Sequence, residues 1–104
     1  MEKNPLNIGI IGLGTVGLGV VECLVKNRKT IALSAGREIK ISGICAKRKN
    51  KKRELDLSNF RWISDPLTLS DDSEIDVVVE LIGGKDEPAK SIIEKSLLNK
   101  KHVV

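Results

Sequence analysis

Aromatic residues are nearly absent from this sequence, which has no tyrosine, one phenylalanine and one tryptophan among 104 residues. Proteins that bind single-stranded nucleic acids stack bases on aromatic side chains, so a surface of that kind is not predicted. Long apolar runs are also missing, and no segment approaches the roughly 20 residues that a membrane-spanning helix requires. Residues 1–5 lead directly into a strand-like run, so no secretory signal peptide is predicted.

Cysteine is scarce as well, with only Cys23 and Cys45 in the chain. Two cysteines are too few for a disulfide framework, and these two lack the spacing of a metal site. We expect both to be buried thiols in a reducing cytoplasm. The remaining composition, 40% hydrophobic and 31% charged with a net charge of +4, is typical of a folded protein. The length predicts one compact domain that covers residues 1–104.

Strand-like segments recur along the chain. Apolar, β-branched stretches at residues 6–11, 39–46 and 75–82 predict buried strands, and shorter strands are predicted at 60–63 and 101–104. Strands that alternate with helices are joined by right-handed crossovers, which place helices on both faces of a parallel sheet. The sequence therefore predicts an α/β fold with a doubly wound parallel sheet.

Helical segments separate these strands, except that residues 29–38 are expected to form a long connection. A helix is predicted from about Thr15, with an apolar stripe formed by Val16, Val20, Val21, Leu24 and Val25. Asp65-Pro66 and Asp86-Glu87-Pro88 predict two further helix starts, because an acidic cap followed by proline suits the first turn. The last helix is expected to bury Ala89, Ile92, Ile93, Ser96 and Leu97.

A glycine-rich turn, Gly12-Leu13-Gly14-Thr15-Val16-Gly17, follows the first predicted strand. In the G-x-G-x-x-G pattern, the first glycine allows a tight turn, the second admits a pyrophosphate, and the third lets the helix approach the sheet. Backbone amides near Thr15 and Val16 would point at the phosphates. Because the turn lies between a buried strand and an amphipathic helix, it predicts a Rossmann fold that binds a nicotinamide dinucleotide.

The end of the second predicted strand indicates which dinucleotide binds. A carboxylate at that place normally accepts hydrogen bonds from the ribose hydroxyls and repels a 2′-phosphate. Here Lys47 and Arg48 follow the strand, and the next acids come after a basic run at residues 47–53. We expect Lys47 and Arg48 to bind the 2′-phosphate of NADP, with NAD as the alternative. Residues 49–53 are expected to form a solvated loop.

Four segments together resemble the cofactor domain of homoserine dehydrogenase, namely residues 12–17, 76–84, 87–90 and 101–104. The most distinctive of them contains Glu80-Leu81-Ile82-Gly83-Gly84. That family interconverts L-homoserine and L-aspartate 4-semialdehyde with NAD(P), a step in threonine, methionine and isoleucine biosynthesis. The resemblance implies a pyrophosphate site at Leu13, Thr15 and Val16, an adenosine end at Lys47 and Arg48, and a nicotinamide side at Ile82 and Gly83.

The resemblance also implies what the chain lacks. In that family, a turn with a catalytic lysine follows the strand that matches residues 101–104, and a further domain binds homoserine and forms a homodimer. The sequence ends at Val104, so we expect it to bind cofactor without turnover unless another chain supplies those residues.

No catalytic or metal-binding residue is predicted within the chain. His102 lies in a predicted buried strand and is expected to be a structural histidine, in the core or at a sheet edge. Glu80 is expected to orient a loop or to cap a backbone amide rather than to act in catalysis. Cys23 has no histidine near it in the sequence, so it is not expected to be a nucleophile.

Two alternatives stay open from the sequence. One is the cofactor domain of another NADP-dependent oxidoreductase. The other is a module without enzyme activity that binds nucleotides or nucleic acids through residues 47–53, because a basic run attracts phosphate backbones. The sequence contains no recognised nucleic-acid motif and little aromatic character, so no nucleic-acid partner is expected.

Overall fold

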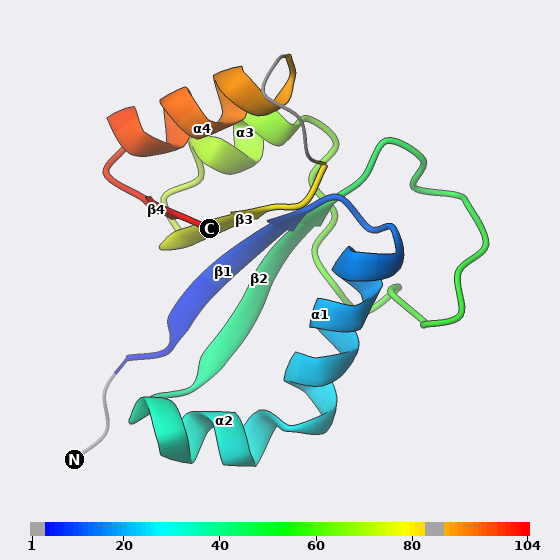
Figure 1. Ribbon diagram of the computed structural model, residues 1–104, viewed down its shortest axis with the longest axis vertical. Helices are drawn as coiled ribbons and strands as arrows, with labels where there is room; N and C mark the ends of the chain where they lie inside the picture. The colour runs from blue at the N-terminus through cyan, green and yellow to red at the C-terminus, as the bar shows by residue number, and fades with distance from the viewer. Residues whose placement is uncertain (1–3, 83–86) are drawn as a thin grey trace.

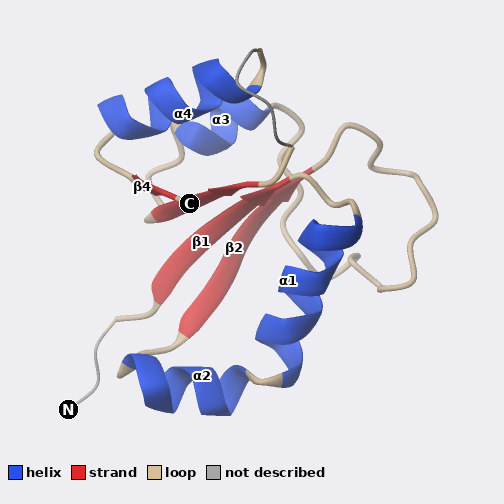
Figure 2. Ribbon diagram, viewed as in Figure 1, coloured by secondary structure: helices blue, strands red, loops and turns tan. Residues whose placement is uncertain are grey.

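The structure, a computed structural model, describes residues 4–82 and 87–104. Strands and helices alternate within these ranges as the sequence predicts (Figures 1 and 2). In chain order the elements are β1 (Leu6–Ile11), α1 (Thr15–Lys26), α2 (Arg28–Ala35), β2 (Ile39–Cys45), α3 (Pro66–Ser70), β3 (Val77–Glu80), α4 (Ala89–Leu98) and β4 (His102–Val103). None of these helices has the length and apolar content needed to cross a bilayer.

The strands form one parallel sheet in the order β2-β1-β3-β4. The chain runs from β1 to β2 through α1 and α2, and then returns past β1 to form β3 and β4. In Figure 1, α1 and α2 lie on one face of the sheet, and α3 and α4 lie on the other. The predicted doubly wound α/β fold is therefore confirmed. The strand order reverses beside β1, which is where such sheets bind ligands, at the carboxyl ends of their strands.

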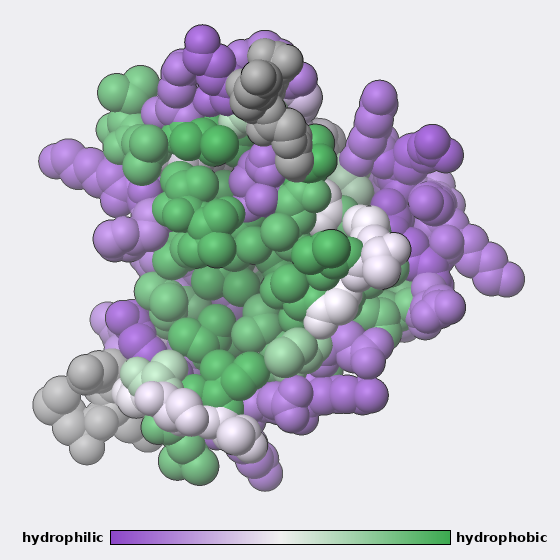
Figure 3. Space-filling model, in the orientation of Figure 1, coloured by the Kyte–Doolittle hydropathy of each residue, from purple (hydrophilic) through white to green (hydrophobic). Residues whose placement is uncertain are grey.

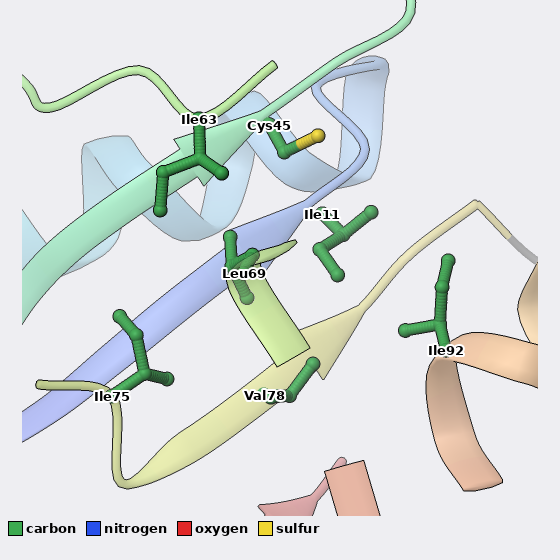
Figure 4. Packing of buried hydrophobic residues seen from close by; sticks show 7 residues of the cluster. All are labelled: Ile11, Cys45, Ile63, Leu69, Ile75, Val78 and Ile92. Atoms are coloured by element: carbon green, nitrogen blue, oxygen red, sulfur yellow. The ribbon is translucent and has the colours of Figure 1, made fainter. Parts of the chain in front are cut away.

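Two apolar clusters, one on each face, hold the helices against the sheet. Alternate residues of a strand point to opposite faces, so β1 contributes Ile10 to one cluster and Ile11 to the other. Figure 4 shows the cluster on the α3–α4 face: Ile11, Cys45, Ile63, Leu69, Ile75, Val78 and Ile92. The cluster on the α1 face consists of Ile8, Ile10, Leu13, Val21, Ile44 and Leu57.

The helix start predicted at Asp65-Pro66 is confirmed. The Asp65 carboxylate accepts a hydrogen bond from the Leu67 amide at 2.9 Å, and Pro66 is the first residue of α3. The strand predicted at residues 60–63 is reduced to one bridge, in which Trp62 pairs with Ile44 of β2. Its two hydrogen bonds join the Ile44 amide to Arg61 and the Ile63 amide back to Ile44.

The start of α4 differs from the prediction, because Pro88 is the capping residue itself rather than the first helical residue. Asp86 and the strand end expected at Gly83-Gly84 lie outside the described residues. The predicted inner stripe is confirmed for Ala89, Ile92 and Ser96, which are buried, while Ile93 is half-buried. It is wrong for Leu97, whose side chain is 59% exposed.

Two further predictions are wrong, and a third is confirmed in part. Residues 29–38 are mostly helical rather than a connection, because α2 spans Arg28–Ala35 and ends at Gly36 in the left-handed conformation. No residue of α2 is buried. A helix that packs no side chain into the core does not need the wide apolar stripe by which a helix is recognised in a sequence. Cys23 is exposed on α1, whereas Cys45 is buried as expected. His102 is the expected sheet-edge histidine, because β4 is the edge strand in the described sheet, but its side chain is exposed rather than buried.

The predicted apolar stripe of α1 is confirmed in part, because Val20, Val21 and Leu24 belong to the core packing on this face. Gly17 and Val21 are buried, whereas Val16 and Val25 are 65% and 57% exposed. Residues four apart lie on the same face of a helix, so the contact of Gly17 with the preceding turn brings Val21 toward the sheet. The close approach of Gly17 to the preceding turn, rather than the number of valines on a face, determines which face of α1 packs against the sheet.

Candidate functional site

A cleft of about 740 Å³ opens at the carboxyl ends of β1, β2 and β3. Main-chain hydrogen bonds join the three strands at its floor. The Gly12 amide donates to the Cys45 carbonyl at 2.8 Å, and the Leu81 amide donates to the Ile11 carbonyl at 2.8 Å. The lining residues are Ile11, Gly12, Leu13, Gly14, Cys45, Ala46, Lys47, Arg48, Lys51, Arg53, Ser64, Pro66, Leu81, Ile82 and Pro88.

The glycine turn forms one wall of this cleft, and its glycines answer different steric demands. Gly12 has a φ of +102°, and a Cβ there would lie 2.9 Å from the Leu81 carbonyl carbon. A Cβ on Gly17 would lie 2.0 Å from the Gly12 carbonyl oxygen. Gly14 faces open space, with nothing within 4 Å of a Cβ. The first and third glycines are therefore required by the packing of the protein itself, whereas a side chain at Gly14 would meet no protein atom.

Helix α1 begins directly behind this open space. Its capping residue is Gly14, which offers no side-chain acceptor, and its first turn contains no acidic residue. The first amides of a helix have no acceptor inside the helix, and the helix dipole adds positive potential there. Thr15 and Val16 are exposed at this end and do not line the cleft themselves. Their backbone amides are suited to bind an anion such as a diphosphate.

A second wall of the cleft carries a strong positive charge. Lys47, Arg48, Lys51 and Arg53 line the cleft, and no described lining residue is Asp or Glu. Glu54 and Asp56, the next acids along the chain, are outside it. Figure 3 shows hydrophilic side chains gathered where this loop lies, beside the glycine turn. The arrangement favours a ligand with a phosphate beyond the end of β2, because no described lining residue carries a negative charge that would repel it.

The basic loop, defined as residues 47–53, is more ordered than the sequence suggests. The guanidinium of Arg53 donates to main-chain carbonyls of Leu13, Arg48, Lys49 and Lys51, at 3.4, 2.8, 3.2 and 3.2 Å. Arg53 is half-buried rather than solvated. Sequence reasoning did not identify it, because an arginine within a run of cations gives no sign that its partners are backbone carbonyls.

The third wall follows β3. Leu81 and Ile82 line it, and Ile82 is 46% exposed, whereas Gly83, also expected on this side, lies outside the described residues. Pro88, at the start of α4, closes the far end of the lining. This wall is apolar, in contrast to the basic loop, so the cleft offers different chemistry to the two ends of an elongated ligand.

Cys45 is the one cysteine in the lining. Burial and the nearby Asp65 carboxylate raise the pKa of its thiol to about 11, so it is a neutral thiol near pH 7 rather than a nucleophile. Within residues 4–82 and 87–104, no group of three or more His, Cys, Asp or Glu side chains is arranged to hold a metal ion. The chemistry that the described cleft supports is binding of a nucleotide.

Comparison with known proteins agrees with this geometry. The family model of the homoserine dehydrogenase NAD-binding domain matches residues 12–104. The chain is 41% identical to homoserine dehydrogenase of Neisseria gonorrhoeae over 100 residues. This aligned region covers 96% of the chain and 22% of that protein. Its identity to the Pseudomonas aeruginosa enzyme is 43% over 100 residues, again with 96% and 22% coverage.

The fold is similar to that of a solved relative. The crystal structure of S. aureus homoserine dehydrogenase at pH 7.0 superposes with a TM-score of 0.88 and 38% identity, over 98% of this chain and 26% of that one. The chain thus spans about a quarter of the length of the proteins that it matches. On the match over residues 12–104, the chain belongs to the family of homoserine dehydrogenase NAD-binding domains.

Proposed function

We propose that this chain is the cofactor-binding part of a homoserine dehydrogenase and that it binds NADP in preference to NAD. The observation that carries the preference is the lining of the cleft, which has four cationic side chains and no described carboxylate. A carboxylate at the end of β2 would select NAD by binding the ribose hydroxyls and repelling a 2′-phosphate. Here Cys45 and Ala46 occupy that place, followed by Lys47 and Arg48.

The proposed placement of the cofactor assigns one part of the dinucleotide to each wall. The diphosphate lies over Gly14 against the amides of Thr15 and Val16, with Leu13 beside it. The 2′-phosphate lies against Lys47 and Arg48, because arginine offers a fork of donors and lysine a compact charge. The nicotinamide lies toward Ile82 and Gly83. The open space at Gly14 and the contrast between basic and apolar walls support this orientation.

For the whole enzyme we propose the interconversion of L-homoserine and L-aspartate 4-semialdehyde, within threonine, methionine and isoleucine biosynthesis. The bound nicotinamide supplies hydride transfer, and a protein group must move the hydroxyl proton. Among the described lining residues there is no such group: the thiol is neutral, and the charged side chains are lysines and arginines around the proposed adenosine end. We therefore assign proton transfer, homoserine binding and dimer formation to parts of the enzyme beyond these 104 residues.

Isothermal titration of the 104-residue chain with NADP⁺ and with NAD⁺ tests the proposal. The 2′-phosphate should add charge-assisted hydrogen bonds of about 1.5–3 kcal/mol, so we expect NADP⁺ to bind at least about tenfold more tightly. Equal affinities would contradict the preference, and no binding of either would contradict cofactor binding. A single-stranded oligonucleotide is the control, since its binding would instead support a nucleic-acid module and should fall steeply with salt.

A further inference from the structure

The guanidinium of Arg53 is half-buried and donates hydrogen bonds to four main-chain carbonyls. Its Nε donates to Leu13 at 3.4 Å, one terminal nitrogen donates to Lys49 and Lys51 at 3.2 Å each, and the other donates to Arg48 at 2.8 Å. Arginine has five N–H donors, so these bonds engage four of the five. The side chain therefore joins three carbonyls of the basic loop to one carbonyl of the glycine turn.

The indole ring of Trp62 contacts the Arg53 guanidinium. The Arg53 guanidinium carbon lies 5.8 Å from the ring centroid, which is within range of a cation–π contact. The indole is itself fixed, because its Nε1 donates to the Leu57 carbonyl at 3.1 Å. Arg53 is thus held on a side chain that the fold positions independently of the basic loop.

The basic loop needs such a tether. Six of its seven residues are Lys or Arg, and runs of like charge repel one another and extend. A ligand that has to fold such a loop would lose binding free energy in ordering it. The hydrogen bond from Arg53 to Leu13 folds the loop back onto the glycine turn, and Lys47, Arg48 and Lys51 line the cleft.

We propose that Arg53 is a positioning residue that determines the preference for NADP. It holds the basic loop against the glycine turn, so that other cations meet the 2′-phosphate, while its own donors stay on the backbone. This inference rests on the proposed function, since it concerns the phosphate end of that cofactor. Lysine cannot replace arginine in this role, because one ammonium group cannot span carbonyls that lie on both sides of a planar fork.

The test uses three variants of the 104-residue chain. Arg53→Lys keeps the charge and loses the fork, while Arg53→Gln and Lys52→Gln each remove one positive charge from the same loop. Lys52 is exposed, and within the described residues it makes no hydrogen bond or ion pair, so it is the matched control for charge. Each variant is titrated with NADP⁺ and NAD⁺, and amide hydrogen exchange of residues 47–53 is measured without ligand.

We expect Arg53→Lys to weaken NADP⁺ binding by about tenfold, which corresponds to about 1.4 kcal/mol, and NAD⁺ binding by less than about twofold. The ratio of the two affinities separates this role from a general loss of stability, which would weaken both ligands together. Exchange of the loop amides should become faster in both Arg53 variants, because local opening costs less free energy without the tether. Lys52→Gln should change neither the ratio nor the exchange.

An unchanged affinity ratio in Arg53→Lys would overturn the proposal, and so would unchanged loop exchange. A fallen ratio with unchanged exchange would identify Arg53 as a direct phosphate ligand, which also overturns it. If the wild-type chain binds NADP⁺ and NAD⁺ equally, the proposed preference fails by itself, and the exchange comparison still tests the tether. Should Arg53→Gln fail to fold, Arg53→Lys decides the question alone.

Discussion

Gly17 lies so close to Gly12 that a Cβ on Gly17 would stand 2.0 Å from the Gly12 carbonyl oxygen. This contact joins the first turn of α1 to the end of β1, and a side chain at either glycine would have to move main-chain atoms. It also sets the rotation of α1, because the face that carries Gly17 must be the face that carries Val21 into the core. One glycine therefore fixes both the position and the orientation of the helix behind the cleft.

Replacing Gly17 with alanine should lower the free energy of unfolding by about 3 kcal/mol, since the added methyl group overpacks a contact with rigid backbone. Gly19→Ala, in the same helix, is the control. Gly19 faces open space, so alanine there should raise stability by about 0.5–1 kcal/mol through its higher helix propensity. Urea denaturation followed by circular dichroism measures both. Equal stability of the two variants would show that the contact at Gly17 is not rigid.

Gly14→Ala should separate folding from binding. The backbone at Gly14 is extended, with φ −77° and ψ −159°, and a Cβ there meets nothing within 4 Å. We expect the free energy of unfolding to change by no more than about 1 kcal/mol, the usual cost of alanine at a helix cap. Binding of NADP⁺ should weaken by more than about tenfold, because the methyl group occupies the proposed diphosphate position. Unaltered affinity in calorimetry would place the diphosphate elsewhere.

The double variant Lys47→Gln/Arg48→Gln should lose most of the preference for NADP. Two charge-assisted contacts are removed, so NADP⁺ affinity should fall by about 10- to 100-fold while NAD⁺ affinity changes little. Lys29→Gln, an exposed residue of α2 that does not line the cleft, controls for net charge. Calorimetry at two salt concentrations completes the experiment, because loss of phosphate contacts should also reduce the salt dependence. A selective loss with Lys29→Gln would contradict the assignment.

Lys101→Met should destabilise the chain by about 2–4 kcal/mol. The Lys101 ammonium is buried and donates to the carbonyls of Asp72 and Ile75 at 2.6 and 2.7 Å. Methionine keeps the length of the side chain and leaves both carbonyls without this donor, which costs about 1–3 kcal/mol for each unsatisfied group. Lys90→Met, exposed on α4, should change stability by less than about 0.5 kcal/mol. Thermal unfolding compares them, and similar losses would refute the role of the ammonium.

The thiol of Cys45 should be slow to react at pH 8. Its pKa is raised from 9.0 to about 11, chiefly by burial and then by Asp65, so little thiolate is present. Because folding raises this pKa, the neutral Cys45 thiol makes its full contribution to the stability of the folded state below pH 9. That contribution is lost as the pH rises through about 11.

A disulfide reagent tests this with two single-cysteine variants. Cys23→Ser leaves only the buried thiol, and Cys45→Ser leaves only the exposed one. The variant that retains Cys45 should react much more slowly at pH 8, and NADP⁺ should slow it further, because Cys45 lines the cleft. Equal rates for the two variants would contradict the burial of Cys45.

Much of the fold could be predicted because parallel strands buried on both faces have a plain apolar signal, as residues 6–11 do. Helix α2 could not, since it buries no residue and its sequence has no apolar stripe. The predicted apolar stripe of α1 was right for Val21 and wrong for Val16 and Val25, which are exposed. The close packing assigned to Gly17 is the signal that separates them, because it implies a buried position four residues later, at Val21.

The candidate site divides in a similar way. The glycine turn, Lys47, Arg48 and Ile82 were predicted to form the site. All of these residues line one cleft except Thr15, Val16 and Gly17. Arg53 and Lys51 were expected in a solvated loop, yet both line it. Their positions depend on how the loop folds back onto the glycine turn. Arg53 is held there by backbone carbonyls, and because every residue has a carbonyl, such contacts leave no pattern in the sequence.

The hydrogen bonds from Gly12 to Cys45 and from Leu81 to Ile11 have a practical consequence. They join the three strands at the floor of the cleft through main-chain atoms alone, so they do not depend on the side chains of Lys47, Arg48 and Lys51, which are exposed. Substitutions meant to change the proposed coenzyme preference can therefore be confined to these three residues, with Arg53 retained and no strand redesigned.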